Sequence, residues 1–281
     1  MRLIPESPIC RSGLASLDDL ACEELLAIRR LLEEQQQRFL LEEAAFRSTD
    51  YPWPRDALHN WSRIWEYPFV FAQLRRLAGN GDASASVMDF GSGVTFFPFA
   101  ATSLGHRLVC VDVDPVVGRD LERAVLAHRV SASEVRFVAT DGRSVPLPDA
   151  SFDCIYSISV LEHIPDPAAL VPELARLLRP KGMLILTIDV SIHGRNAEIQ
   201  PRPHSILERA LNAHFDLLLP ERAIHPQRML TSDNSPFPFA PALGFGIRSR
   251  LRRGALAALR ETFFIDRGIR LACQAYVLER R

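Results

Sequence analysis

VMDFGSG, at residues 87–93, reads as a short buried strand, then a glycine turn, then the start of a helix. Gly91 and Gly93 have no Cβ, so the backbone of this turn lets a ligand that carries a nucleoside come close. Asp89 places a carboxylate beside the turn. Asp112 lies 21 residues after Gly91, at the end of the next apolar run. An acid about 20 residues beyond the glycines meets ribose hydroxyls in a Rossmann-type unit, so this stretch predicts a nucleoside site.

Two cofactors that contain adenosine, NAD and S-adenosylmethionine (SAM), are candidates for this turn. The NAD fingerprint has a third glycine three residues after the second, and Phe96 holds that position here. Asp89 flanks the helix N-terminus that a pyrophosphate would need, whereas its carboxylate suits the cationic amine of a methionine. These residues favour SAM over NAD, and a tight turn without a ligand is the remaining alternative.

Strands and helices alternate after residue 86. The apolar runs are continuous, as expected for central strands of a parallel sheet that is covered on both faces. We therefore predict an α/β, Rossmann-like fold with a mostly parallel, seven-stranded-type sheet and helices on both faces. The expected strands are residues 87–90, 108–112, 135–139, 152–157, 183–188 and 271–278, with residues 216–219 as a further candidate strand. The expected helices are residues 95–104, 115–130, 167–178 and 206–215.

The chain before this pattern predicts a helical cap, residues 1–80, ahead of a ligand-binding domain, residues 81–281. Ser16 can cap a helix, and the apolar spacing predicts one long helix or two shorter ones through about Phe46. We expect this helix to pack on the domain, and a dimerisation helix in a homodimer is the alternative. The helix-breaking sequence Gly-Asn-Gly at residues 79–81 marks the expected boundary.

Aromatic side chains concentrate in residues 51–69, which hold all three tryptophans of the chain. Trp61 and Trp65 are four residues apart and share one helix face. That face is either part of the core or the wall of a substrate pocket, because an aromatic ring suits both. Trp53 and Trp61 are therefore candidate substrate-binding residues.

Polar residues follow four of the expected strands, at the edge where open α/β sheets bind ligands. Asp112 ends the second strand and can accept two hydrogen bonds from a ribose diol. Asp141 follows the third strand and can accept one from an exocyclic amine, while Gly142 leaves room for a flat ring. Residues 157–163 follow the fourth strand. Acids at consecutive strand ends indicate a nucleoside site more strongly than any single acid.

The chain resembles the class I SAM-dependent methyltransferases, in the broad subgroup with many small-molecule enzymes. The resemblance implies that Asp89, Gly91 and Gly93 surround the methionine part of SAM, Asp112 the ribose, and Asp141 with Gly142 the adenine. One departure is Thr95, which stands where the family's glycine loop commonly has a third glycine. The matching segments cover about 100 residues: VMDFGSG (87–93), LVCVDVDP (108–115), VRFVATDG (135–142), LPDASFDCIYSISVLEHIPD (147–166) and LLRPKGMLILT (177–187). The candidate cofactor-binding residues are Asp89, Gly91, Ser92, Gly93, Asp112, Val113, Asp141, Gly142 and Ser157.

This family transfers a methyl group by in-line displacement, so the protein's task is to align the acceptor, the methyl group and the sulfur in a dry pocket. A base is needed only where the acceptor must lose a proton, and His163 is the candidate base on the loop after the fourth strand. Its alternative role is to support that loop. His193, after the fifth strand, is a candidate substrate residue.

The acceptor is expected under the cap and under an insertion at about residues 190–246. Their aromatic residues suit a small, flat or apolar molecule. An arginine-rich helix predicted at residues 247–261 suits an anionic or glycan-type acceptor, although a solvated face is the simpler interpretation. A SAM-binding or partner-binding protein without catalysis is the alternative to a small-molecule or glycan methyltransferase.

The composition of the chain argues against several other classes of function. A net charge of −1 and the lack of a basic stripe argue against a nucleic-acid partner. The absence of an 18-residue apolar run argues against a membrane partner. The five cysteines are scattered without a CxxC pair, so we expect no metal site and no disulfide framework. A cytoplasmic location follows as an expectation.

Overall fold

The computed structural model describes residues 7–79, 84–131, 133–192, 201–237 and 271–281. In these ranges eight strands form one sheet. They are β1 (Gly13–Leu14), β2 (Ser86–Phe90), β3 (Arg107–Asp112), β4 (Val135–Ala139), β5 (Phe152–Ile158), β6 (Leu178–Ser191), β7 (Phe215–Leu217) and β8 (Leu271–Arg280). The order across the sheet is β1-β8-β6-β5-β2-β3-β4, and β7 pairs with β8.

The core of the sheet is parallel. β4, β3, β2, β5 and β6 pair in parallel, whereas β8 runs antiparallel to β6 and also to β1 and β7. The chain moves outward from β2 through β3 to β4 and then returns to the other side of β2 as β5. The strand order therefore reverses between β2 and β5, which is where open α/β sheets hold their ligands.

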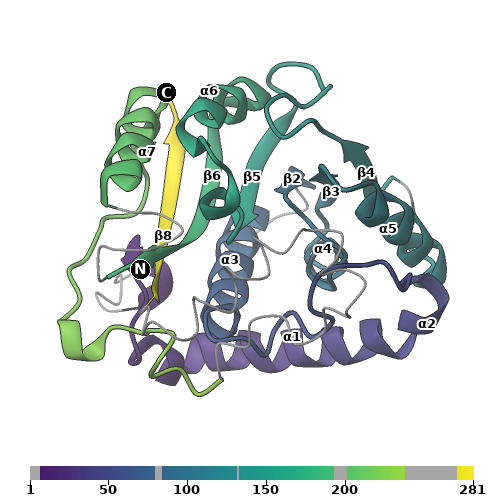
Figure 1. Ribbon diagram of the computed structural model, residues 1–281, viewed down its shortest axis with the longest axis horizontal. Coiled ribbons are helices and arrows are strands. Elements are labelled where there is room, and N and C mark those ends of the chain that lie inside the picture. The colour runs from purple at the N-terminus through teal and green to yellow at the C-terminus, as the bar shows by residue number, and fades with distance from the viewer. Residues whose placement is uncertain (1–6, 80–83, 132, 193–200, 238–270) are drawn as a thin grey trace, which may run out of the picture.

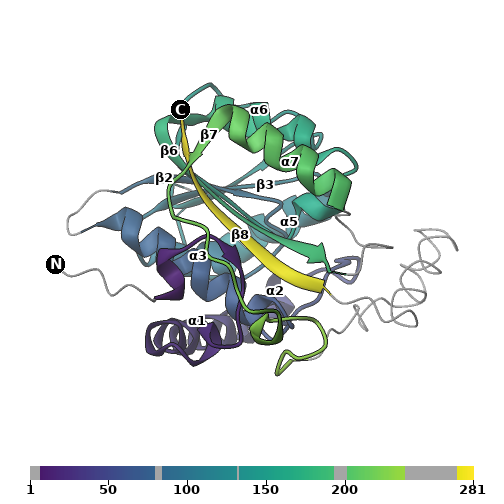
Figure 2. The same ribbon diagram turned by 90° about the vertical axis from the view of Figure 1, so that its left-hand side faces the viewer.

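Helices cover both faces of the sheet, as predicted (Figures 1 and 2). Buried side chains of α1, α2, α3, α4 and α5 join one hydrophobic cluster, and those of α6 and α7 join the cluster on the other face. The helices are α1 (Glu23–Leu41), α2 (Glu43–Phe46), α3 (Arg63–Ala78), α4 (Phe97–Thr102), α5 (Pro115–Ala127), α6 (Pro167–Leu177) and α7 (Pro201–His214). Both clusters draw on the central strands, so these strands are mostly apolar on both faces, with buried polar exceptions that include Asp89 of β2 and Ser157 of β5.

The N-terminal residues are built into this fold. β1 pairs with β8, and α3 lies between α1 and the sheet in both ribbon views. The long helix begins at Glu23 rather than after Ser16. The reason is Asp19, whose carboxylate accepts hydrogen bonds from the Ser16 backbone N–H and the Trp65 indole, each at 2.9 Å. The division of the chain at residue 80 stays a prediction.

Three further elements differ from the sequence prediction. α7 begins at Pro201 rather than at residue 206, because Pro201 and Pro203 are tolerated in the first turn of a helix. α4 is shorter than expected, ending at Thr102 before Gly105, whose φ of 84° terminates the turn. β6 begins at Leu178, five residues earlier than expected, and reaches Phe152 of β5 across an irregular register. The early part of β6 contains Lys181 at a φ of 65°, a conformation that strand propensity does not predict.

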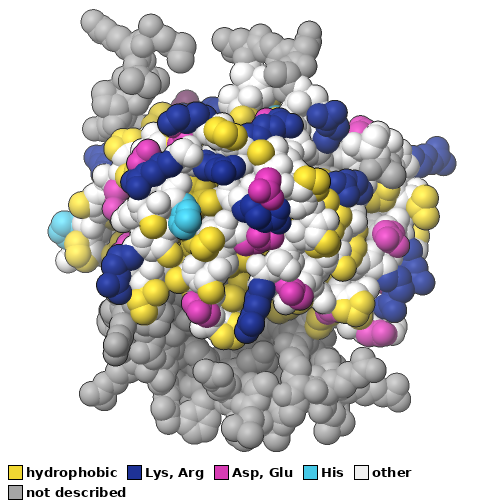
Figure 3. Space-filling view, turned by 90° about the horizontal axis from the view of Figure 1, so that it is seen from above, with side chains coloured by type: hydrophobic (Ala, Val, Ile, Leu, Met, Phe, Trp, Pro, Cys, Tyr) yellow, Lys and Arg dark blue, Asp and Glu magenta, His cyan; other side chains and the backbone are white. Residues whose placement is uncertain are grey.

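The predicted acceptor-covering insertion is only partly described. Within it, α7 packs beside α6, and residues 226–228 form a short 3-10 helix. The arginine-rich helix predicted at residues 247–261 lies outside the described residues. Among the helices that are described, none combines the length and apolarity needed to cross a bilayer. Basic and acidic side chains are interspersed on the face seen from above Figure 1 (Figure 3).

Candidate functional site

The glycine turn sits at the carboxyl ends of β2 and β3. The backbone N–H groups of Gly91 and Ser92 both donate to the carbonyl of Val111, at 2.8 and 3.2 Å. Gly91 has a φ of 76° and Gly93 a φ of 53°, which side chains other than glycine rarely adopt. A Cβ on Gly91 would lie 2.5 Å from the Val160 side chain. The protein's own loop after β5 therefore needs this glycine, independently of any ligand.

Asp112 lies against the turn, as the sequence offset predicts. Its Oδ2 accepts a hydrogen bond from the Gly93 N–H at 3.0 Å, and its Oδ1 accepts one from the Asp114 N–H at 3.0 Å. Burial raises the pKa of this carboxyl. A carboxylate has about four lone-pair positions, so both oxygens can still accept from a diol.

Asp89 is a buried carboxylate, with only 5% of its surface exposed. It stands opposite Tyr156 in the pairing of β2 with β5, at the point where the strand order reverses. Burial, together with the nearby charge of Asp112, raises the pKa of Asp89 to about 8. An acid held this far from water favours a cationic ligand, because a positive charge beside it restores the ionised form.

The predicted adenine side is more open. Val113 is 61% exposed, and a Cβ on Gly142 would meet its Cγ1 at 3.2 Å, so the two residues lie side by side. Asp141 Oδ1 accepts from the N–H groups of Arg143 and Ser144, at 2.8 and 2.7 Å. These backbone hydrogen bonds lower the pKa of Asp141, so it is an ionised acceptor at neutral pH.

Ser157 and Ser92, two predicted cofactor-binding residues, use their side-chain hydroxyls to hold the glycine turn in place. Ser157 is fully buried and donates to the carbonyl of Phe90 at 2.9 Å, which ties β5 to the end of β2. The Ser92 hydroxyl donates to the carbonyl of Gly93 at 3.1 Å. The hydrogen bonds that these two hydroxyls donate therefore stabilise the shape of the turn. That either residue contacts a cofactor stays a prediction.

The candidate catalytic and substrate-binding residues differ in their exposure to solvent. His163 is exposed on a 3-10 turn, η3 (Leu161–His163), whereas its neighbour Glu162 is buried. Trp61 is only 1% exposed and belongs to the core, which favours the core interpretation of its face, while Trp53 is 46% exposed. His193 lies outside the described residues.

Arg47 and Tyr51 contact the glycine turn, and the sequence did not single them out. The Tyr51 hydroxyl accepts from the Val94 N–H at 2.8 Å, and Arg47 Nη2 donates to the Val94 carbonyl at 3.1 Å. The guanidinium lies 4.4 Å from the Tyr51 ring centroid. The Arg47 side chain is buried and its Nε forms an ion pair with Glu43, whereas its Nη1 has no hydrogen-bond partner among the described residues. Such an orphaned donor beside the turn suits a carboxylate.

We expect Tyr51→Phe to destabilise the fold by about 1–2 kcal/mol and to weaken cofactor binding several-fold, since it leaves the Val94 N–H without its acceptor. Thermal unfolding and a SAM titration measure the two effects. Tyr276→Phe is the matched control, because its hydroxyl bonds Glu208 at 3.1 Å beside α7, away from the turn. The prediction fails if both variants bind SAM equally well.

Comparisons with known proteins agree with this geometry. A family model described as a methyltransferase domain matches residues 88–186. An uncharacterised methyltransferase of Mycobacteroides abscessus is 31% identical over 137 residues, 48% of each chain. The chain thus spans about half the length of the curated relatives it matches.

Many solved structures share the fold, among them two that align with most of this chain. One is a proposed sarcosine dimethylglycine methyltransferase of Galdieria sulphuraria, with a TM-score of 0.56 and 13% identity over 88% of this chain and 98% of that one. The other is the [4+2]-cyclase SpnF, with a TM-score of 0.54 and 17% identity over 90% and 96%. At these identities the likeness concerns the fold alone.

Proposed function

Residues 88–186 of this chain are a class I SAM-dependent methyltransferase domain, and on that premise we propose that the chain transfers a methyl group from SAM to a small-molecule or glycan-type acceptor. The observation that carries this proposal is the hydrogen bond from the Gly93 N–H to Asp112. This hydrogen bond places Asp112, the acid expected to bind the ribose, directly against the glycine turn.

We assign the parts of SAM along this edge by charge. Asp89, buried at the strand-order reversal, takes the cationic amine of the methionine. Arg47, with its orphaned Nη1, takes the carboxylate of the methionine. Asp112 takes the ribose diol, and the pair formed by Val113 and Gly142 takes the face of the adenine.

The acceptor would enter beside the methionine end, between the N-terminal residues and the loop after α7. These two segments touch: the His59 and Phe237 rings are 5.1 Å apart, and the Ser235 hydroxyl donates to the Trp61 carbonyl at 2.9 Å. This contact supports an acceptor covered by both segments, with the exposed Trp53 as a candidate contact and His193 as a further proposed one.

Methyl transfer needs alignment more than acid–base chemistry, because the sulfonium already activates the methyl group. The protein positions the acceptor in line with sulfur and methyl and keeps water out. Where the acceptor must lose a proton, we propose that the η3 turn receives it at His163. The exposed ring can pass the proton on to solvent.

The proposal is tested by incubating the protein with methyl-labelled SAM and with metabolite and glycan fractions of a cell extract. We expect label in one low-molecular-mass or glycan fraction. His163→Gln should lower that transfer about 100-fold if the histidine is the base, with SAM affinity unchanged. SAM binding with no labelled product in any fraction would instead support the non-catalytic alternative.

A further inference from the structure

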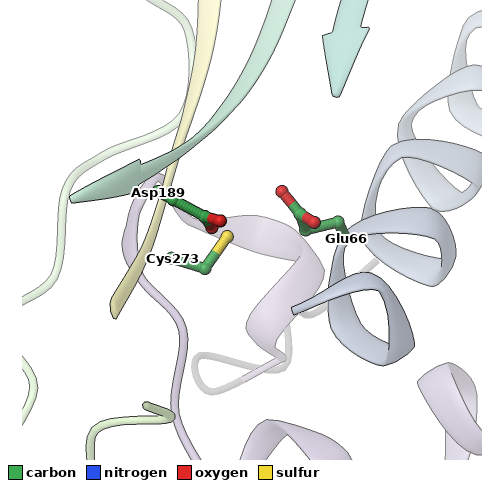
Figure 4. A group of neighbouring side chains, drawn as sticks. All are labelled: Glu66, Asp189 and Cys273. Carbon is green, nitrogen blue, oxygen red and sulfur yellow. The ribbon is translucent and has the colours of Figure 1, made fainter. Parts of the chain in front are cut away.

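Three buried side chains from distant parts of the chain converge at one end of the sheet. They are Glu66 of α3, Asp189 of β6 and Cys273 of β8, and their donor atoms all lie within 4.8 Å of one another. Asp189 and Cys273 are paired across β6 and β8, and Figure 4 shows both pointing toward Glu66. The exposed fractions are 0%, 7% and 0%.

We propose that Glu66, Asp189 and Cys273 bind a divalent cation of the zinc type. Two carboxylates and one thiolate are a donor set that Zn²⁺ accepts, whereas Mg²⁺ and Ca²⁺ prefer oxygen alone. In a tetrahedral zinc site, neighbouring donors lie about 3.5 Å apart. The three donor atoms, which all lie within 4.8 Å of one another, are already close to that spacing.

Glu162 provides a second, independent observation. Its Oε1 accepts a hydrogen bond from the Asp189 backbone N–H at 3.0 Å, so its carboxylate lies at this cluster. Its Oε2 is buried and has no hydrogen-bond partner among the described residues. An orphaned buried oxygen costs about 1–3 kcal/mol. Water on the fourth position of a bound cation would donate to it and remove that cost.

Arg63 and Ser159 hold the Glu66 carboxylate in place. Arg63 forms an ion pair with Oε2, and the Ser159 hydroxyl donates to Oε1 at 2.7 Å. Each oxygen keeps a lone pair, so these contacts orient the ligand as outer-shell partners do in metal sites. Binding would release the thiol proton of Cys273 to solvent, since only the thiolate is a ligand.

A cation at this cluster would join α3 of the N-terminal part to two strands of the sheet. The site lies near the carboxyl end of β6, the edge that carries the cofactor residues. No short sequence motif indicates this cation site, because its proposed ligands are far apart in the sequence, at positions 66, 189 and 273. Spacings of this size explain why the sequence indicated no metal site.

The test is a titration of untagged, chelator-treated protein with Co²⁺, followed by competition with Zn²⁺. We expect one Co²⁺ per chain and a sulfur-to-cobalt charge-transfer band, displaced by Zn²⁺ but not by excess Mg²⁺. Cys273→Ser should abolish the band and Glu66→Gln should weaken Zn²⁺ binding by about 100-fold or more, since loss of an outer-shell partner alone costs about 10–100-fold.

Cys154→Ser is the matched control, because Cys154 is equally buried but outside the cluster, and it should keep the band. If Cys273→Ser does not fold, as judged by circular dichroism, Glu66→Gln and Asp189→Asn are the remaining ligand variants, and both should weaken Zn²⁺ binding. Wild-type protein without the band, or a band that survives in Cys273→Ser, would overturn the proposal. Either result leaves the methyltransferase proposal untouched.

Discussion

Gly91→Ala is expected to destabilise the protein by about 3 kcal/mol and to abolish measurable SAM binding. Gly91 has a φ of 76°, and a left-handed conformation costs a residue with a Cβ about 1–2 kcal/mol. The new Cβ would also lie 2.5 Å from two methyl carbons of Val160, and overpacking of this kind costs about 1–3 kcal/mol more. Denaturant unfolding and a SAM titration measure both effects.

Two matched variants separate the backbone cost from the clash. Gly105→Ala shares the positive φ, at 84°, but its Cβ would meet nothing within 4 Å, so only the backbone cost should appear. Adding Val160→Ala to Gly91→Ala removes the clashing methyl groups and should recover part of the stability. If Gly91→Ala is no worse than Gly105→Ala, the contact between the two loops is not what requires this glycine.

Asp89→Asn should make the ligand-free protein more stable and yet weaken SAM binding at least about 10-fold. Burial raises the pKa of Asp89 from 3.8 to about 8 in the folded protein. At pH 7 the folded state therefore holds a proton that the unfolded chain has released, which penalises folding. We expect asparagine, which carries no proton to hold, to gain about 1–3 kcal/mol at that pH.

The stability difference between wild type and Asp89→Asn should depend on pH in a defined direction. A raised carboxyl pKa makes the wild type lose stability as pH rises from about 4 to 8, with no further loss above the folded pKa. The advantage of Asp89→Asn should therefore be absent near pH 4, grow to pH 8 and then stay constant. Unfolding measured at several pH values gives this curve, and a difference that is independent of pH would exclude a titrating Asp89.

Ionisation of Asp89, which lowers the stability of the ligand-free protein, should raise its affinity for SAM. A cationic ligand favours the ionised carboxylate, so wild-type affinity should rise relative to that of Asp89→Asn between pH 6 and 8. The ionisation of the SAM amine is common to both proteins and cancels in this ratio. Equal affinities at pH 8 would remove Asp89 from the site.

The sequence predicted the features that depend on neighbouring residues. Apolar runs bounded by glycine and proline located the central strands to within about two residues, apart from β6, which begins earlier and ends later than expected. The glycine pair and the acid at the expected offset brought Asp112 to the turn, as the structure confirms. These signals are local, so one sequence contains them in full.

What the sequence could not give depends on contacts between distant residues. Tyr51 reaches Val94 only because α1, α2 and the segment after them fold back across the sheet. Ser16 matches a helix cap, yet Asp19 takes its N–H because Trp65 and Arg11 fix that carboxylate. The convergence at positions 66, 189 and 273 likewise follows from strand pairing and not from spacing.

Asp89, the glycine turn and Asp112 together form the proposed SAM site. The most direct measurement is the wild-type arm of the titration above, made by calorimetry at pH 8 with SAM and, separately, with NAD. We expect one SAM per chain with a dissociation constant in the micromolar range, which corresponds to a binding free energy of about −8 kcal/mol, and no heat from NAD. Saturable NAD binding, or no SAM binding at millimolar concentration, would contradict it.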